Sequence, residues 1–146
     1  MNTSLFLCFF KKPLLFVFIL NITILTTLPM EKLEGWEAKA YSPEILKQLI
    51  ELRSKQTPEQ IKNIKDRWHT LIAKAYASID QDPSSQSAQQ IFKDWMNLAN
   101  EEYQGYDEVK AAKGLAYKNN LIPDSPFDQK LWDFLEKTAI YMYQNQ

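Results

Sequence analysis

The stretch Thr57–Ala99, TPEQIKNIKDRWHTLIAKAYASIDQDPSSQSAQQIFKDWMNLA, decides the fold of this chain. On both sides of its Asp-Pro step, apolar side chains recur every three or four residues, the spacing that places them on one face of an α-helix. Each half carries a tryptophan near its middle, Trp68 and Trp95. The stretch therefore predicts two amphipathic helices joined by a short turn.

Four further signals mark where helices begin. A side chain that can accept a hydrogen bond precedes a proline at Ser42-Pro43, Thr57-Pro58, Asp82-Pro83 and Ser125-Pro126. Such a side chain can cap a free N–H of the first turn, and proline is tolerated there because its missing N–H would have no partner. Thr57 and Gln60 also have the spacing of a capping box. We expect each of these pairs to start a helix.

The apolar periodicity extends this pattern to the rest of the chain. It predicts helices at roughly Pro43–Ser54, Pro58–Ile79, Ser85–Glu102, Asp107–Lys118 and Pro126–Tyr143. A glycine turn at Gly105 separates the third from the fourth. No segment alternates with a period of two, so we expect no strands. The predicted fold class is all-α, a single compact domain of about five helices.

Composition and charge exclude several functions. The net charge is −1, so no basic excess favours nucleic acid as a direct partner. The one cysteine, Cys8, lies in the N-terminal apolar segment, and the one histidine, His69, lies beside the apolar stripe of its helix as a surface or boundary residue. No nucleophile–base pair, phosphate loop or metal-ligand set can be assembled from these residues. We therefore expect no cofactor, no metal site and no catalytic residues, and a protein that is not an enzyme.

An acidic group surrounds Gly105. It consists of Glu101, Glu102, Asp107 and Glu108. Paired carboxylates can hold a hard cation or act as acid and base. The second pair, however, falls at a helix N-terminus, where the helix dipole favours negative charge. We expect solvated or structural charge here, with a functional role as the less favoured alternative.

The first 29 residues differ from the remainder. The run Leu14–Leu28 is apolar over about 15 residues, which is short for a membrane-spanning helix but suits a signal-peptide core or a marginal anchor. Alternatively, translation starts at Met30. The second explanation, which we favour, predicts a cytoplasmic protein, whereas retention of residues 1–29 predicts a membrane-anchored one. The domains are thus 1–29, a short polar lead-in at 30–40, and a helical domain at 41–146.

The order of motifs resembles the TipAS antibiotic-recognition domain, the effector half of certain MerR-type regulators. The motifs are RWHTLIAKAY at 67–76, the turn with Asp82-Pro83, SAQQIFKDWMNL at 87–98, YQGYDE at 103–108, LAY at 115–117 and TAIY at 138–141. The likeness covers about Leu49 to Tyr143. It implies a globin-like helical fold without haem, and a cleft that captures amphipathic antibiotics or related ligands.

The chain departs from those regulators in two respects. Before Tyr41 it has only the apolar segment and a short polar stretch, with no winged helix-turn-helix and no coiled-coil helix. Beyond Cys8 it has no cysteine, which excludes covalent capture of a ligand by a thiol of the helical part, as occurs with thiopeptides in the family. We therefore expect stand-alone binding or sequestration, or ligand sensing in transcription regulation with a partner.

Aromatic residues are the candidate lining of the cleft. The six candidates are Trp68, Phe92, Trp95, Tyr103, Tyr117 and Trp132. Any one of these rings is more simply explained as core, but a set of them between helices suits a flat, mostly apolar ligand. The expected ligand is an antibiotic or another amphipathic drug-like molecule. The alternative is a helical protein–protein interaction module without a small-molecule ligand, which could include a homodimer.

Overall fold

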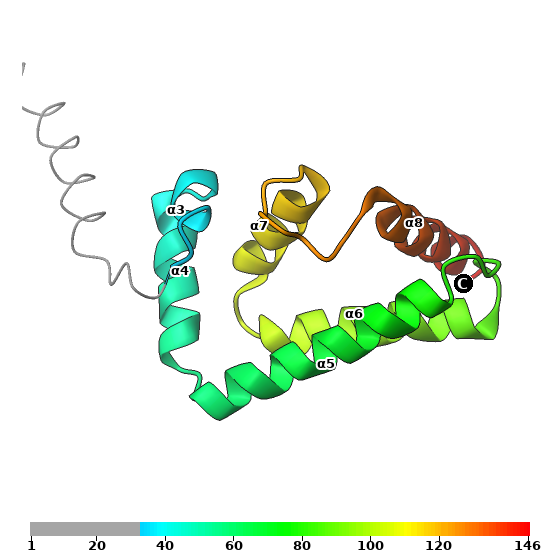
Figure 1. Ribbon diagram of the computed structural model, residues 1–146, viewed down its shortest axis with the longest axis horizontal. Coiled ribbons are helices and arrows are strands. Elements are labelled where there is room, and N and C mark those ends of the chain that lie inside the picture. Colours follow the sequence, from blue (N-terminus) through cyan, green and yellow to red (C-terminus); the bar gives the residue numbers. More distant parts are fainter. Residues whose placement is uncertain (1–32) are drawn as a thin grey trace, which may run out of the picture.

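A computed structural model describes residues 33–146, which form six α-helices and no strand (Figure 1). The helices are α3 (Glu37–Ala40), α4 (Pro43–Ser54), α5 (Pro58–Ala77), α6 (Gln86–Glu102), α7 (Asp107–Lys118) and α8 (Gln129–Gln144). The predicted all-α fold class is confirmed. The apolar segment 1–29, with the run Leu14–Leu28, lies outside the described residues. Within residues 33–146, no helix is both long enough and apolar enough to cross a membrane.

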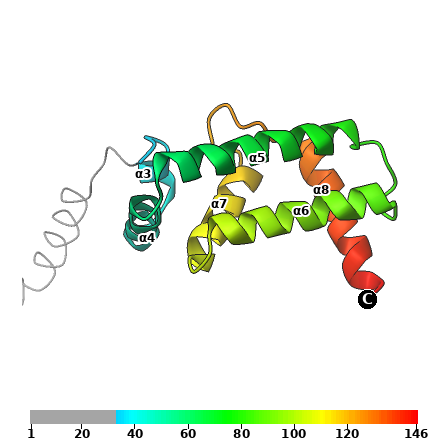
Figure 2. The same cartoon turned by 90° about the horizontal axis from the view of Figure 1, so that it is seen from below.

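Helices α5 and α6 form the base of the molecule. They lie side by side and run in opposite directions, as Figures 1 and 2 show from two sides. Helices α4, α7 and α8 lie over one face of this pair, with α4 at one end, α8 toward the other and α7 between them (Figure 1). Helix α4 packs against α7, and α6 packs against α8.

Two of the predicted helix starts are confirmed in full. The Ser42 hydroxyl accepts the N–H of Ile45 at 3.4 Å and begins α4. The Thr57 hydroxyl accepts the N–H of Gln60 at 3.1 Å, and the Gln60 side chain accepts the N–H of Thr57 at 2.8 Å. This is the predicted capping box, and it begins α5.

The predicted cap at Asp82 is wrong. The Asp82 carboxylate accepts the N–H of Ser84, two residues on, at 2.8 Å, which stabilises a turn instead of a helix. Helix α6 begins after Ser85, whose hydroxyl accepts the N–H of Ala88 at 3.2 Å. A short polar side chain can bond its own local backbone, and this competes with capping.

The predicted start at Ser125-Pro126 is wrong for the same reason. The Ser125 hydroxyl bonds both the N–H and the carbonyl of Phe127, two residues on, within a loop. Helix α8 begins after Asp128, whose carboxylate accepts the N–H of Leu131 at 2.9 Å. Residues 126–128, which we expected in the last helix, therefore belong to the connection before α8.

Helix α3 lies within residues 30–40, which we expect to be a short polar lead-in. It has four residues, too few for any apolar periodicity to show. Its Glu37 side chain is fully buried and forms two hydrogen bonds of 2.7 Å with the Arg53 guanidinium of α4. The segment after Glu34 is therefore packed against the helical domain.

The apolar interior divides into two clusters. The larger joins α5, α6 and α8 through Leu71, Ala75, Ala88, Ile91, Trp95, Leu98, Leu131, Phe134 and Leu135. The smaller joins α4, α7 and the end of α6 through Leu49, Leu52, Tyr103 and Val109. Full burial of one such leucine contributes about 1.5–3 kcal/mol, so both clusters hold their helices firmly. The molecule therefore has two packed groups of helices.

Gly105 makes the turn that connects the two groups. Its φ is +82°, in the left-handed region that glycine adopts without steric cost. The predicted glycine turn between α6 and α7 is confirmed. It directs α7 back over the base, so that Lys113 and Tyr117 of α7 line the same space as Trp68 of α5.

Candidate functional site

A cavity of about 500 Å³ lies where the two groups of helices meet. Side chains from α4, α5, α6, α7, the loop before α8 and α8 itself line it. The volume falls within the range of about 300–1,000 Å³ that is typical of small-molecule sites. We refer to this space as the main cavity.

Aromatic rings in mutual contact form one wall of the main cavity. The Trp68 and Trp95 rings meet edge to face, with 5.0 Å between their centroids. Phe127 then contacts Trp95 at 5.2 Å, Tyr117 at 4.3 Å and Trp132 at 5.8 Å. Tilted and edge-to-face rings at such distances attract each other beyond the effect of burial. The wall is a continuous apolar surface drawn from five parts of the chain, namely α5, α6, α7, the loop before α8 and α8 itself.

The structure brings five of the six candidate residues to the main cavity. These are Trp68, Trp95, Tyr103, Tyr117 and Trp132. Phe92 is not among the lining residues. It faces a second cavity of about 220 Å³, which Trp132 also lines, and its ring lies 6.5 Å from that of Tyr143. That any of the six contacts a ligand stays a prediction.

Phe127 is a lining residue that the candidate set lacks. Its ring is central to the aromatic wall, because three other rings contact it. Helical periodicity predicts Phe127 on the apolar stripe of the last helix, whereas it lies in the loop before α8. Asp128, a capping residue three positions before the apolar Leu131, is the sequence signal that would have placed Phe127 in a loop.

A tyrosine hydroxyl fixes the loop that carries Phe127. The Tyr76 hydroxyl of α5 donates to the carbonyl of Pro126 at 3.0 Å and accepts the N–H of Asp128 at 3.3 Å. These bonds hold the backbone on both sides of Phe127. The ring is therefore positioned by α5 as well as by its own neighbours.

Glu102 places a carboxylate in the main cavity. The indole N–H of Trp68 donates to it at 2.7 Å, across the α5–α6 pair. Burial raises the pKa of the Glu102 carboxyl, because it disfavours the charged form. Its neighbour Glu101 is exposed and pairs with Arg67 outside the cavity. Of the expected solvated or structural charge, Glu101 is the solvated kind, whereas Glu102 is half-buried and bonded to Trp68 instead of merely solvated.

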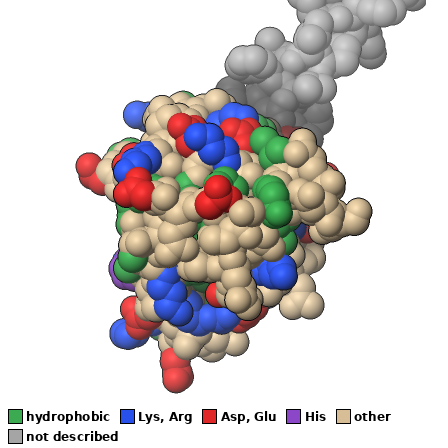
Figure 3. Space-filling view, turned by 90° about the vertical axis from the view of Figure 1, so that its right-hand side faces the viewer, with side chains coloured by type: hydrophobic (Ala, Val, Ile, Leu, Met, Phe, Trp, Pro, Cys, Tyr) green, Lys and Arg blue, Asp and Glu red, His purple; other side chains and the backbone are tan. Residues whose placement is uncertain are grey.

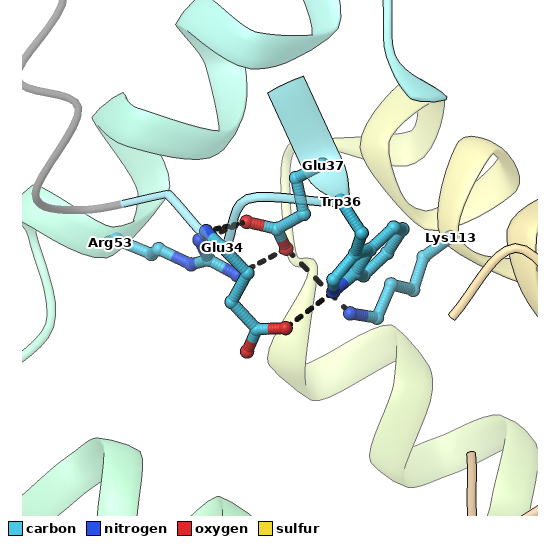
Figure 4. A network of polar contacts seen from close by, with 5 residues as sticks. All are labelled: Glu34, Trp36, Glu37, Arg53 and Lys113. Carbon is cyan, nitrogen blue, oxygen red and sulfur yellow. Dashed lines mark hydrogen bonds and ion pairs between the residues drawn. The ribbon is translucent and has the colours of Figure 1, made fainter. Parts of the chain in front are cut away.

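One face of α7 contributes both charge and an aromatic ring. Lys110, Lys113, Gly114 and Tyr117 line the main cavity at intervals of three or four residues, the spacing of one helix face. The Lys113 ammonium lies 4.7 Å from the centre of the Trp36 ring and 5.6 Å from that of Tyr117. Burial lowers the pKa of Lys113. Figure 4 shows Lys113 reaching toward Trp36 and Glu37 of the N-terminal segment.

Two tyrosines give the cavity neutral hydroxyl groups. Burial raises the pKa of Tyr117 to about 12, and burial followed by the charge of Glu102 raises the pKa of Tyr103 well above its usual range. Both hydroxyls therefore stay protonated at neutral pH. Each can donate or accept a hydrogen bond.

The remaining polar lining includes His69. Its side chain is exposed and lies at the rim of the main cavity on α5. Within residues 33–146, no group of three or more His, Cys, Asp or Glu side chains is placed to hold a metal ion. The chemistry that this lining offers is aromatic contact, hydrogen bonding and charge.

These residues form a small all-α domain with an aromatic cavity between two groups of helices. The chain belongs to the family of TipAS antibiotic-recognition domains, because the sequence model of that family matches residues 34–141. The matched range contains α3 and most of α8. Comparison with the curated proteins and with the solved structures gives no match.

Proposed function

We propose that this chain binds an antibiotic or another amphipathic, drug-like small molecule in the main cavity. The observation that carries the proposal is the wall of contacting rings around a space of about 500 Å³, within a domain of an antibiotic-recognition family. Aromatic surfaces bind flat apolar ligands well, because both partners lose contact with water. The polar groups beside the wall would orient such a ligand.

Binding can act in two ways. The domain can sequester its ligand, or it can serve as the ligand-sensing part of a transcription regulator. In the second role the recognition domain would act together with a DNA-binding partner. Both roles begin with the same binding step, which is the step to test first.

Thermal unfolding tests the binding step. The full-length chain is melted alone and with each member of a panel of thiopeptide and aromatic antibiotics. A ligand at about 100 times its Kd stabilises the native state by about 2.7 kcal/mol, which raises the Tm of a domain of this size by several degrees. We expect at least one compound to do so. A panel without any shift contradicts the proposal.

A matched pair of variants locates the ligand. Phe127→Leu removes the ring at the centre of the aromatic wall, and Phe92→Leu makes the same change beside the second cavity. The Tm shift should shrink for Phe127→Leu and persist for Phe92→Leu. Equal loss in both variants, or loss in Phe92→Leu alone, would place the ligand elsewhere.

One observation favours the alternative, a protein interaction module. Ile140 and Tyr143 on the last turns of α8 are 49% and 66% exposed. On the end of the molecule shown in Figure 3, however, apolar side chains are scattered among charged and polar ones. Sedimentation velocity separates the two functions. An oligomer that Ile140→Asp dissociates, in a chain that binds no panel compound, would support the interaction module.

A further inference from the structure

The main cavity has a charged end beside its aromatic wall. Four of its lining side chains are cationic, namely Arg53, Lys65, Lys110 and Lys113. Two are carboxylates, Glu34 and Glu102. The lining therefore has an excess of positive charge, although the whole chain has a net charge of −1.

Three of these cations are already engaged or lie in solvent. Arg53 forms two hydrogen bonds with Glu37, each of 2.7 Å. Lys110 donates to Asn100 at 2.9 Å and to Asp107 at 3.1 Å. The side chain of Lys65 is exposed on α5. None of these three needs a ligand to satisfy it.

Lys113 differs from the other three. Its side chain is only 20% exposed, and its ammonium forms no hydrogen bond with any residue from 33 to 146. It forms an ion pair with Oε1 of Glu37 at 3.8 Å, a separation too long for a hydrogen bond. An ammonium has three N–H donors, and burial without acceptors for them costs free energy. The rings of Trp36 and Tyr117 compensate only part of this cost.

The carboxylates around Lys113 supply opposite charge but no hydrogen bond to its ammonium. Glu34, Glu37 and Glu102 each favour the charged form of Lys113. Burial has the larger, opposite effect, so the pKa of Lys113 is lowered. Each carboxylate already accepts a hydrogen bond from another side chain. The donors are Trp36 for Glu34, Arg53 for Glu37 and Trp68 for Glu102. Figure 4 shows the first two of these pairs beside the Lys113 side chain.

The Lys113 ammonium lies beside the aromatic wall. Tyr117 lies one turn further along the same face of α7, and its ring contacts Phe127 at 4.3 Å. A flat ligand against Tyr117 and Phe127 would carry a substituent toward Lys113. An anionic substituent would supply the missing acceptors in a short charge-assisted hydrogen bond, which the ion pair with Glu37 at 3.8 Å does not provide.

We infer that Lys113 recognises an anionic group of the ligand, and that the ligand is an aromatic amphiphile with one negatively charged end. This inference rests on the proposed function, because it concerns the same cavity. It adds a chemical class to that function. The aromatic wall provides affinity, and Lys113 selects molecules that carry a carboxylate, sulfonate or similar group.

Two fluorescent probes with nearly the same aromatic body test the inference. 1-Anilinonaphthalene-8-sulfonate carries a negative charge, and N-phenyl-1-naphthylamine lacks the sulfonate and is neutral. Each is titrated into the full-length chain, and its Kd is measured from the fluorescence. We expect the sulfonate to bind more tightly, by about tenfold, as one charge-assisted hydrogen bond implies.

Three variants assign the preference to Lys113. Lys113→Met keeps most of the side-chain volume and should remove the preference, leaving the Kd of the neutral probe within about twofold. Lys113→Arg keeps the positive charge and should retain the preference for the sulfonate. Lys74→Met removes one charge from an exposed site on α5 that lines neither cavity, and should change neither Kd.

The outcomes distinguish failure of this inference from failure of the proposed ligand-binding function. If neither probe binds and no panel compound raises the Tm, the proposed function fails. If both probes bind equally, or if Lys113→Met and Lys74→Met weaken the sulfonate to the same extent, the inference is overturned while the binding function stands. Circular dichroism of each variant shows whether it is folded. If Lys113→Met does not fold, loss of the preference in Lys113→Arg overturns the inference.

Discussion

At the scale of single residues, the buried side chain of Glu37 holds the N-terminal helix α3 in place. Its carboxylate is fully buried in a helix of four residues, and it accepts hydrogen bonds from Arg53 and from the N–H of Glu34. The carboxylate therefore fixes α3 against α4.

Glu37→Gln should destabilise the protein by about 2 kcal/mol. Loss of one partner of a fully buried ion pair costs about 3–5 kcal/mol, and the cost is lower here because the Arg53 side chain is 26% exposed. Urea denaturation measures the change. As a control, Glu51→Gln removes an exposed partner of Lys55 and should cost less than about 1 kcal/mol. Equal effects of the two changes would contradict the role of Glu37.

Glu102 makes stability depend on pH in a specific direction. Its pKa is raised in the folded state, so the folded protein binds a proton more readily than the unfolded chain does. This carboxyl group therefore lowers stability at pH values above its folded pKa. The penalty disappears as the pH falls toward 4.5, the ordinary value for glutamate.

Glu102→Gln should therefore be more stable than the original protein at pH 7. The amide oxygen can still accept the N–H of Trp68, but no charge is buried. The stability difference should shrink as the pH falls and vanish near pH 4. Thermal melts of both proteins from pH 4 to pH 8 measure this difference. A difference that is independent of pH, or a less stable variant at pH 7, would contradict the account.

At the scale of single residues, the sequence reveals rings more readily than it reveals charges. Trp68 and Trp95 stand out because helical periodicity places each on an apolar stripe. Glu102 does not, because its burial depends on a bond to Trp68, 34 positions away, that only the α5–α6 pairing creates. Glu37 is hidden for the same reason, since Arg53 belongs to another helix.

At the scale of elements, the sequence predicts most helix bounds to within one or two residues, but two of the four predicted caps are wrong. Predicted and observed bounds coincide for α4 and α7, and α6 differs by one residue. Asp82 and Ser125 have the right chemistry for caps, yet each bonds the backbone two residues on. Local turns and helix caps use the same side chains, so the sequence alone does not separate them.

Asp128→Ala should destabilise the protein by about 1 kcal/mol, because Asp128 caps α8 through the N–H of Leu131. Asp133→Ala is the matched control on the same helix. Asp133 is exposed and bonds only the Gln129 side chain among the described residues, so its loss should cost less than about 0.5 kcal/mol. Chemical denaturation measures both. A larger cost for Asp133→Ala would show that α8 begins elsewhere.

At the scale of the whole molecule, two packed groups of helices leave a cavity where they meet. The all-α class and most of the aromatic lining are predictable, because large apolar residues on helix stripes must face the interior. The cavity itself is not, because its volume depends on how α7 and the loop of Phe127 lie over the α5–α6 pair. Phe92 shows that a place near a lining residue in the sequence does not predict a place in the main cavity. It lies three residues from Trp95 but faces the second cavity.

The four tryptophans allow a direct test of the central claim, that a ligand binds against the aromatic wall. A nitrogen-15 spectrum of the full-length chain gives one indole signal for each tryptophan, and we measure it with and without the panel compound that raises the Tm most. The signals of Trp68, Trp95 and Trp132, which line the main cavity, should move strongly, and that of Trp36 should move with them only for a compound whose anionic group reaches Lys113. A bound compound that leaves those three signals in place, or that moves only the signal of Trp36, would contradict the account.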